Sequence, residues 1–170
     1  MMDRRRYDLV FSIYLNSEGF GWVLFEGPSY PVEWGTVRQQ GKAKNARCFQ
    51  KAVELIERLR PDVIVVEKIV AAFSNRTARV VKLSVILETY LEGLGIPFFR
   101  YSREDIRKAF GNLPSPSKDG IAEAISKSIP VLFRFVPPKR KPWKSQDARM
   151  GLFDAAALAL THFQNIDAQQ

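Results

Sequence analysis

The sequence predicts a single α/β domain, residues 1–170, built on a mixed sheet with helices on its faces. Two observations lead there. Apolar segments joined by short turns fill the chain up to residue 37, and helix-like and strand-like patterns alternate from residue 43 onward. With 170 residues, 46% of them hydrophobic and 26% charged, the chain can bury a core and does not have a disordered composition.

The first three elements form an antiparallel meander. The nearly unbroken apolar run from Tyr7 to Leu15 indicates a buried strand, and a turn follows at 16–19. Phe20 to Phe25 and Val32 to Val37 indicate two further strands, separated from each other by Glu26-Gly27-Pro28. Strands joined by connections this short pair antiparallel.

The elements after residue 43 alternate between helix and strand. Apolar residues at three- and four-residue spacing predict a helix at 43–59, and the apolar run at 63–66 predicts a central strand covered on both faces. Gly95 is a C-cap signal that ends one predicted helix. Ser102, followed by Asp105 three residues later, is an N-cap signal that begins the next one. We therefore expect a helix at 77–94, a strand at 96–101, and helices at 102–110, 118–128 and 149–163.

Two segments stand apart from this pattern. Residues 129–145 contain four prolines and many basic residues, and we predict a partly mobile basic surface segment there, within the same domain. Residues 165–170 are predicted to be a frayed tail.

The composition argues against membrane and disulfide-bonded classes. No apolar run approaches the length of a membrane span, so we expect a soluble protein. Cys48 is the only cysteine and cannot form an internal disulfide, which favours a reducing cytoplasm and a structural role for this thiol. His162, the only histidine, has no second histidine with which to bind a metal.

The positive charge is the first indication of function. The net charge is +8, and basic surfaces attract nucleic acid because phosphate neutralisation supplies much of the affinity, although many proteins are basic without binding it. The basic residues are clustered at 4–6, at 100–108 and at 134–149, with aromatic residues between them, as in nucleic-acid-binding surfaces. From the third cluster we predict substrate contacts by Lys139, Arg140, Lys141 and Lys144.

Two acidic residues are candidates for chemistry. Glu67 ends the predicted central strand, where ligands gather in open α/β sheets; the alternative is a solvated strand end or a pair with Lys68. Asp154 lies in an alanine-rich helix, either as a first-turn residue favoured by the helix dipole or as an inward-facing metal ligand. The alanines allow this helix to lie close to the sheet and bring Asp154 near a strand end.

Three stretches carry a resemblance to a known family. They are Phe11-Ser12-Ile13-Tyr14 followed by Gly21-Trp22-Val23-Leu24, then Val65-Val66-Glu67, then the run from Asp154 to His162. They resemble the ribonuclease-H-like superfamily and, within it, the Holliday-junction resolvases of the RuvC type, including phage relatives. The resemblance implies a ribonuclease-H-like mixed five-stranded sheet over roughly Asp8 to His162 and DNA, branched or duplex, as the partner.

The resemblance also implies a catalytic site. In that family four carboxylates hold two Mg²⁺ or Mn²⁺ ions, and Glu67 and Asp154 match two of these catalytic and metal-binding positions. The other two fall on Tyr14 and Gly151, neither of which suits a hard cation. Lys118 matches, by position only, a region where family members contact phosphate, so the resemblance implies a substrate contact there; the alternative is a solvated surface lysine. A homodimer is implied too, for which Val80, Leu83 and Leu87 are either the interface or plain core.

Two functions remain open at this point. The chain is either an active Mg²⁺- or Mn²⁺-dependent endonuclease whose acid set is completed by Glu18 or Asp147, or a nucleic-acid-binding protein that has lost cleavage and needs no metal. Asp147 lies seven residues before Asp154, about 10 Å along a helix, which is long for one metal pair. We expect the second function. A purely protein-binding module would leave the basic clusters unexplained.

Overall fold

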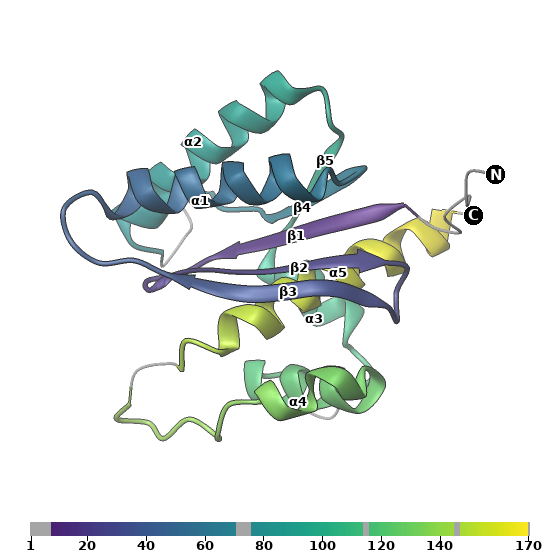
Figure 1. Cartoon of the computed structure of the whole chain (residues 1–170). Coiled ribbons are helices and arrows are strands. Elements are labelled where there is room, and N and C mark those ends of the chain that lie inside the picture. The colour runs from purple at the N-terminus through teal and green to yellow at the C-terminus, as the bar shows by residue number, and fades with distance from the viewer. Residues whose placement is uncertain (1–7, 71–75, 114–115, 145–146, 170) are drawn as a thin grey trace.

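The computed structural model describes residues 8–70, 76–113, 116–144 and 147–169 (Figure 1). The predictions for Arg4–Arg6, Tyr7, Ser145 and Gln170 lie outside the described residues. The elements are, in chain order, β1 (Leu9–Leu15), β2 (Gly19–Glu26), β3 (Pro31–Arg38), α1 (Lys44–Leu59), β4 (Val63–Glu67), α2 (Ala78–Leu94), β5 (Phe98–Tyr101), α3 (Arg103–Ala109), α4 (Lys118–Ser128), the 3-10 helix η2 (Pro130–Phe135) and α5 (Met150–Gln169).

The sheet confirms the predicted mixed architecture. In the described part of the chain it has five strands in the order β3-β2-β1-β4-β5. β2 pairs antiparallel with both β1 and β3, which is the predicted meander. β4 pairs parallel with β1 and with β5, as strand–helix–strand connections require. The carboxyl ends of β1, β4 and β5 therefore meet at one edge.

Helices cover both faces of the sheet, α1 and α2 on one and α3, α4 and α5 on the other (Figure 1). Alternate residues of each strand point to opposite faces. Phe11, Ile13 and Leu15 of β1 accordingly belong to the core under α1 and α2, whereas Val10 and Tyr14 belong to the core under α5. β1 is thus buried on both sides, which explains its nearly continuous apolar sequence.

The helix ends follow local sequence signals. Thr77 accepts a hydrogen bond from the Val80 amide, and Gly95 ends α2 with φ at +74°, a conformation that favours glycine. Ser102 and Asp105 form the reciprocal capping box of α3. The predicted stop at Gly95 and start at Ser102 are both confirmed.

Small residues let α5 lie close to the sheet. Ala155, Ala156, Ala157 and Ala159 are all fully buried. The Ser12 hydroxyl donates a 2.7 Å hydrogen bond to the carbonyl of Ala155, which ties β1 directly to the helix backbone. This close contact confirms the role expected for the alanine-rich helix, and it brings Asp154 over the sheet.

Other expectations are modified by the structure. Val80, Leu83 and Leu87 are buried at 2% exposure, so they are plain core, and α2 exposes Val85 and Ile86 in their place. α5 continues past the predicted end at 163 and is helical to Gln169, so the segment expected to be a frayed tail forms its last, exposed turns. Whether those turns fray in solution stays a prediction.

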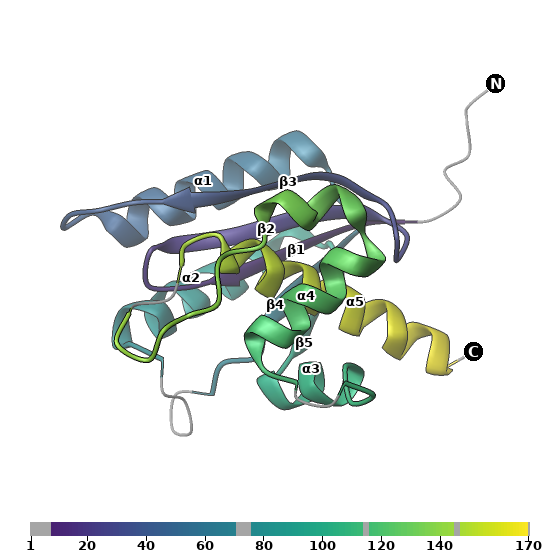
Figure 2. The same ribbon diagram turned by 90° about the horizontal axis from the view of Figure 1, so that it is seen from below.

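The basic segment is anchored before it becomes exposed. Ile129 and Leu132 are buried in the α5-side core, so η2 is part of the packed domain. From residue 138 to 144 every side chain is exposed. Figure 2, which looks onto the α3–α5 face, shows this stretch running past the beginning of α5 and turning back to it.

Two expectations drawn from the composition concerned the role of Cys48 and the presence of a membrane-spanning helix. Cys48 lies buried in α1 as a free thiol, and burial raises its pKa, so it packs as a small helix residue. Across the described ranges, none of the helices combines the length and apolar character of a membrane-spanning segment.

Candidate functional site

The sheet brings Tyr14 and Glu67 side by side at the carboxyl ends of their strands. Ile13 of β1 is in register with Val66 of β4, so the next residues on the two parallel strands are Tyr14 and Glu67. Both share the face covered by α5, because they alternate with residues of the opposite core. Glu67 therefore lies at the strand-end position that the sequence predicted.

Asp154 completes this cluster from the helix side. Its side chain is only 5% exposed, against 10% for that of Glu67. Burial is the main cause that raises the pKa of each carboxyl, and each carboxylate also raises the pKa of the Tyr14 hydroxyl. The structure thus brings together the two acidic residues singled out in the sequence.

Three basic side chains contact the two carboxylates. Lys118 Nζ lies 3.3 Å from Asp154 Oδ2, and Arg103 Nη1 lies 3.7 Å from Asp154 Oδ1. Arg76 Nη2 lies 3.5 Å from Glu67 Oε2. These cations lower the pKa of the carboxyl groups against the larger effect of burial, and burial in turn lowers the pKa of Lys118. Buried carboxylates need such compensation, and here the protein supplies it from its own chain.

Tyr14 occupies the centre of this arrangement. Its hydroxyl accepts hydrogen bonds from Arg76 Nη1 at 3.2 Å and from Lys118 Nζ at 3.3 Å. The same two cations lie over its ring, 5.0 and 5.1 Å from the centroid. Burial, Asp154 and Glu67 together raise the Tyr14 pKa far above its usual value, so it is a neutral phenol and a poor ligand for a divalent ion.

Gly151 is held in a close contact between α5 and β2. A Cβ at this position would lie 2.7 Å from Asn16 Nδ2 and 3.3 Å from the Gly21 nitrogen. The Asn16 amide is itself fixed, because its Oδ1 accepts hydrogen bonds from the Glu18 and Gly19 amides. Asn16 and the backbone of Gly21 thus fill the space that a side chain at 151 would need.

Neither acid considered as a substitute joins the cluster. Glu18 pairs with Arg38 at 3.2 Å, and Asp147 pairs with Arg149 at 2.8 Å. The Arg149 side chain and backbone lower the pKa of Asp147. Within the described ranges, no three histidine, cysteine, aspartate or glutamate side chains come together in a way that could hold a metal ion.

The Mg²⁺ or Mn²⁺ pair that the resemblance implies does not fit these residues. Two metals need several carboxylate oxygens free to bind them. Here Glu67 and Asp154 face Arg76, Arg103 and Lys118, and the positions of the other two acids are a neutral tyrosine and a glycine with no room for a side chain.

A basic pocket opens in front of the cluster. It has a volume of about 720 Å³ and is lined by Tyr14, Glu67, Lys68, Val70, Arg76, Ser102, Arg103, Glu104, Arg107 and Lys118. Five of these side chains are basic and two are acidic, so the lining favours an anionic ligand.

Two further pockets adjoin this one along the basic segment, and the three together are called the groove below. Lys118 also lines a second pocket, together with Pro138, Arg140 and Asp147. Those three residues in turn line a third, with Lys139, Lys141 and Lys144. The pockets share lining residues and therefore lie next to one another. All five residues predicted to contact substrate therefore line these neighbouring pockets, and their contact with DNA stays a prediction.

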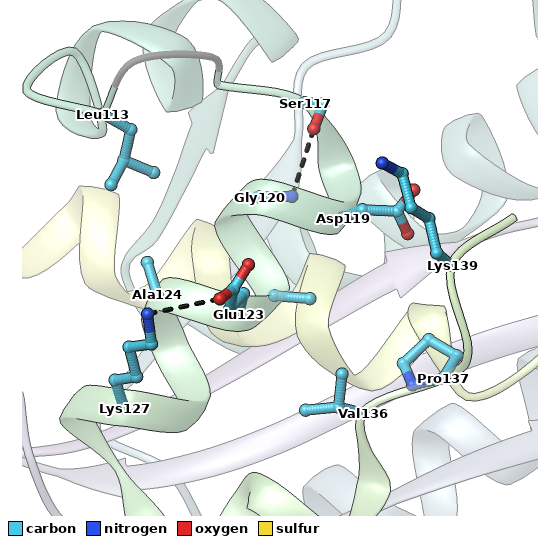
Figure 3. Close-up of a pocket in the computed structure, with 11 residues that line it drawn as sticks. Leu113, Ser117, Asp119, Gly120, Glu123, Ala124, Lys127, Val136, Pro137 and Lys139 are labelled. Atoms are coloured by element: carbon cyan, nitrogen blue, oxygen red, sulfur yellow. Dashed lines mark hydrogen bonds and ion pairs between the residues drawn. The ribbon is translucent and has the colours of Figure 1, made fainter.

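A further pocket of about 640 Å³ lies between α4 and the chain that follows η2 (Figure 3). It is bounded by Ala124 and Leu113 on one side and by Val136 and Pro137 on the other. Its charged groups include Lys127, which pairs with Glu123 at 3.2 Å. Because it shares Asp119 and Pro137 with the pocket that contains Arg140, it widens the groove beside the basic segment.

The sequence analysis missed two of these functional groups. Arg103 was counted only within a surface cluster, and Arg76 was not considered. The signal for both was available, since Arg76 lies in the connection from β4 to the N-cap of α2 and Arg103 begins α3 just after the carboxyl end of β5. Ligand-binding residues of α/β sheets gather at that edge.

Comparison with known proteins identifies the fold class. No protein-family model matches the sequence, and no curated protein does. The five-stranded sheet with its flanking helices is the ribonuclease-H-like fold of the RuvC-type resolvases, as the resemblance predicted.

Three solved structures illustrate this similarity. Thermus thermophilus RuvC matches with a TM-score of 0.67 and 19% identity, over 94% of this chain and 96% of that one. The same protein in complex with a Holliday junction substrate matches with a TM-score of 0.68 and 17% identity, over 96% of this chain and 98% of that one. The yeast mitochondrial Holliday junction resolvase, Ydc2, matches with a TM-score of 0.57 and 18% identity, over 98% and 87%.

Proposed function

We propose that this chain is a RuvC-like DNA-binding protein, specific for branched or duplex DNA, that has lost phosphodiester cleavage. One observation carries the proposal. In a fold shared with RuvC, the two retained carboxylates are paired with Arg76, Arg103 and Lys118 of the same chain. Basic side chains suited to DNA line the groove, whereas only two of the four acidic positions that the resemblance implies carry an acid.

The groove supports the binding half of the proposal. Its three adjoining pockets are lined by Lys118, Lys139, Arg140, Lys141 and Lys144. Exposed aromatic side chains accompany them, with Trp143 76% exposed and Lys141 Nζ 5.6 Å above its ring. Basic side chains that follow a path suit a phosphate backbone, and aromatic rings suit bases. A similar fold has been solved in complex with a Holliday junction substrate.

The carboxylate cluster supports the loss of cleavage. Hydrolysis by two metals needs ligands that hold both ions a few ångströms apart, on either side of the reacting phosphate. Two carboxylates can hold at most one hydrated Mg²⁺, and only after their present cationic partners are displaced. The alternative, an active Mg²⁺- or Mn²⁺-dependent endonuclease with Glu18 or Asp147 in the site, requires Glu18 to leave Arg38 or Asp147 to leave Arg149.

A cleavage assay distinguishes the proposed DNA-binding protein without cleavage from the active endonuclease. The unmodified protein and Glu67→Gln are incubated with a labelled four-way DNA junction and Mn²⁺, with the yeast mitochondrial resolvase as positive control. We expect a shifted protein–junction complex and no cut product from either protein. Robust cutting by the unmodified protein that disappears in Glu67→Gln would contradict the proposal and show that another acid completes the site.

The proposal extends to assembly and location. A homodimer is expected by resemblance, and Val85 and Ile86 on α2, 61% and 45% exposed, offer an apolar surface for it. A cytoplasmic location is supported by Cys48, a buried thiol without a disulfide.

A further inference from the structure

We propose that Arg76, Arg103 and Lys118 hold a backbone phosphate of bound DNA directly, at the place where a metal-loaded site would hold it through divalent ions. The inference rests on the proposed DNA-binding function and assigns the ligand of this pocket. The group to be recognised is a phosphodiester. The site for it is built from three different segments: the residue before the N-cap of α2, the first residue of α3 and the first residue of α4.

The layering of charge in the cluster is the first argument. The side chains of Arg76, Arg103 and Lys118 are 23 to 26% exposed, whereas those of Glu67 and Asp154 are 10% and 5% exposed. The cations therefore form the layer next to solvent, and the carboxylates lie behind them. An anion that enters the pocket meets positive charge first, while a metal ion would have to pass that layer to reach the acids.

The charge of the pocket is the second argument. Of the residues that line it, Lys68 and Arg107 add to the three cations, and Glu67 and Glu104 are the acids. When the buried Asp154 is added to these two acids, the five basic side chains still outnumber the acidic ones by two. A purely structural network of ion pairs does not need this excess, whereas a pocket that receives a phosphodiester does.

The chemistry of the side chains is the third argument. A guanidinium presents a planar fork that matches two phosphate oxygens, and an ammonium binds phosphate as a point charge. The carboxylates and Tyr14 orient these donors before any ligand arrives, since Lys118 and Arg76 are fixed by the Tyr14 hydroxyl and Arg103 lies near Asp154. Donors oriented in advance lose less entropy on binding.

The test uses the full chain and a fluorescein-labelled four-way junction, titrated at constant ionic strength in EDTA and in MgCl₂. Arg103→Gln removes one donor of the site. Arg58→Gln is the matched control, because it removes the same charge from α1, on the opposite face of the sheet, where Arg58 pairs with Glu33. Lys118→Gln is a second variant of the site, and circular dichroism checks that all three variants fold.

We expect the unmodified protein to bind equally well in both buffers. Arg103→Gln and Lys118→Gln should each raise Kd about tenfold or more, the effect of losing a hydrogen bond between charged groups, while Arg58→Gln changes it less than about twofold. Binding that requires MgCl₂, or site variants indistinguishable from Arg58→Gln, would overturn this inference alone. No binding by the unmodified protein in either buffer would overturn the proposed function and this inference with it.

Discussion

Replacing Gly151 with alanine should destabilise the domain, although alanine is the better helix former. The new Cβ would lie 2.7 Å from Asn16 Nδ2 and 3.3 and 3.4 Å from the Gly21 N and Cα atoms. The Gly21 backbone belongs to a strand paired on both sides and cannot retreat, so the Asn16 side chain has to move.

The loss in free energy of unfolding follows from the hydrogen bonds that Asn16 would give up. Its Oδ1 accepts hydrogen bonds of 2.9 Å from the Glu18 and Gly19 amides, each worth about 1 kcal/mol. Overpacking against Gly21 adds about 1 kcal/mol, at the lower end of such effects. The higher helix propensity of alanine offsets up to about 1 kcal/mol. The net cost is about 2 kcal/mol, which lowers the Tm by roughly 4–8 °C in a domain of this size.

The assay is thermal and urea unfolding followed by circular dichroism, in a double-mutant cycle with Asn16→Ala. Once Asn16 is truncated, Gly151→Ala should cost about 1 kcal/mol or less, because only the close approach to Gly21 remains. Gly93→Ala in α2 is the matched control, since a Cβ there meets no atom within 4 Å and should stabilise the protein by about 0.5–1 kcal/mol. A Gly151→Ala protein as stable as the Gly93→Ala control would refute the steric reasoning.

Three further predictions concern binding, assembly and pH. Joint alanine replacement in the exposed basic segment should weaken DNA binding and reduce the salt slope of log Kobs by about 0.9 for each phosphate that is no longer neutralised; the residues are Lys139, Arg140 and Lys141. An unchanged slope would remove them from the binding surface. Light scattering at micromolar concentration should give twice the 19.4 kDa chain mass, and a value at 19.4 kDa would exclude a stable dimer. Burial lowers the pKa of His162, so the stability it contributes is complete above about pH 6.5 and falls, by at most about 1.4 kcal/mol per pH unit, as pH decreases towards the lowered pKa. His162→Phe should flatten the dependence of unfolding free energy on pH in this window, and an identical pH profile would contradict the reasoning.

Local pattern was sufficient for the elements of the fold. The apolar run of β1, the period of α1 and the stop at Gly95 are each written in a few neighbouring residues, and the structure confirms them. The position of Glu67 followed too, because the carboxyl end of a central strand can be located from its apolar run and its flanking residues. Boundaries were less accurate, as the extension of α5 to Gln169 shows, since a polar surface helix lacks the apolar period that marks an end.

The sequence by itself predicted the fold class, and its resemblance to a known family predicted Glu67 and Asp154 as site acids and Tyr14 and Gly151 as the two positions without an acid. Only the tertiary structure decided what replaces the missing ligands. Arg76, Arg103 and Lys118 are far from each other in the chain. Arg76 and Arg103 meet because parallel strands bring the connections after β4 and β5 to one edge of the sheet, and Lys118 joins them because α4 packs against α5. The obstruction at Gly151 likewise depends on the distance between α5 and β2, which packing sets and no local pattern encodes.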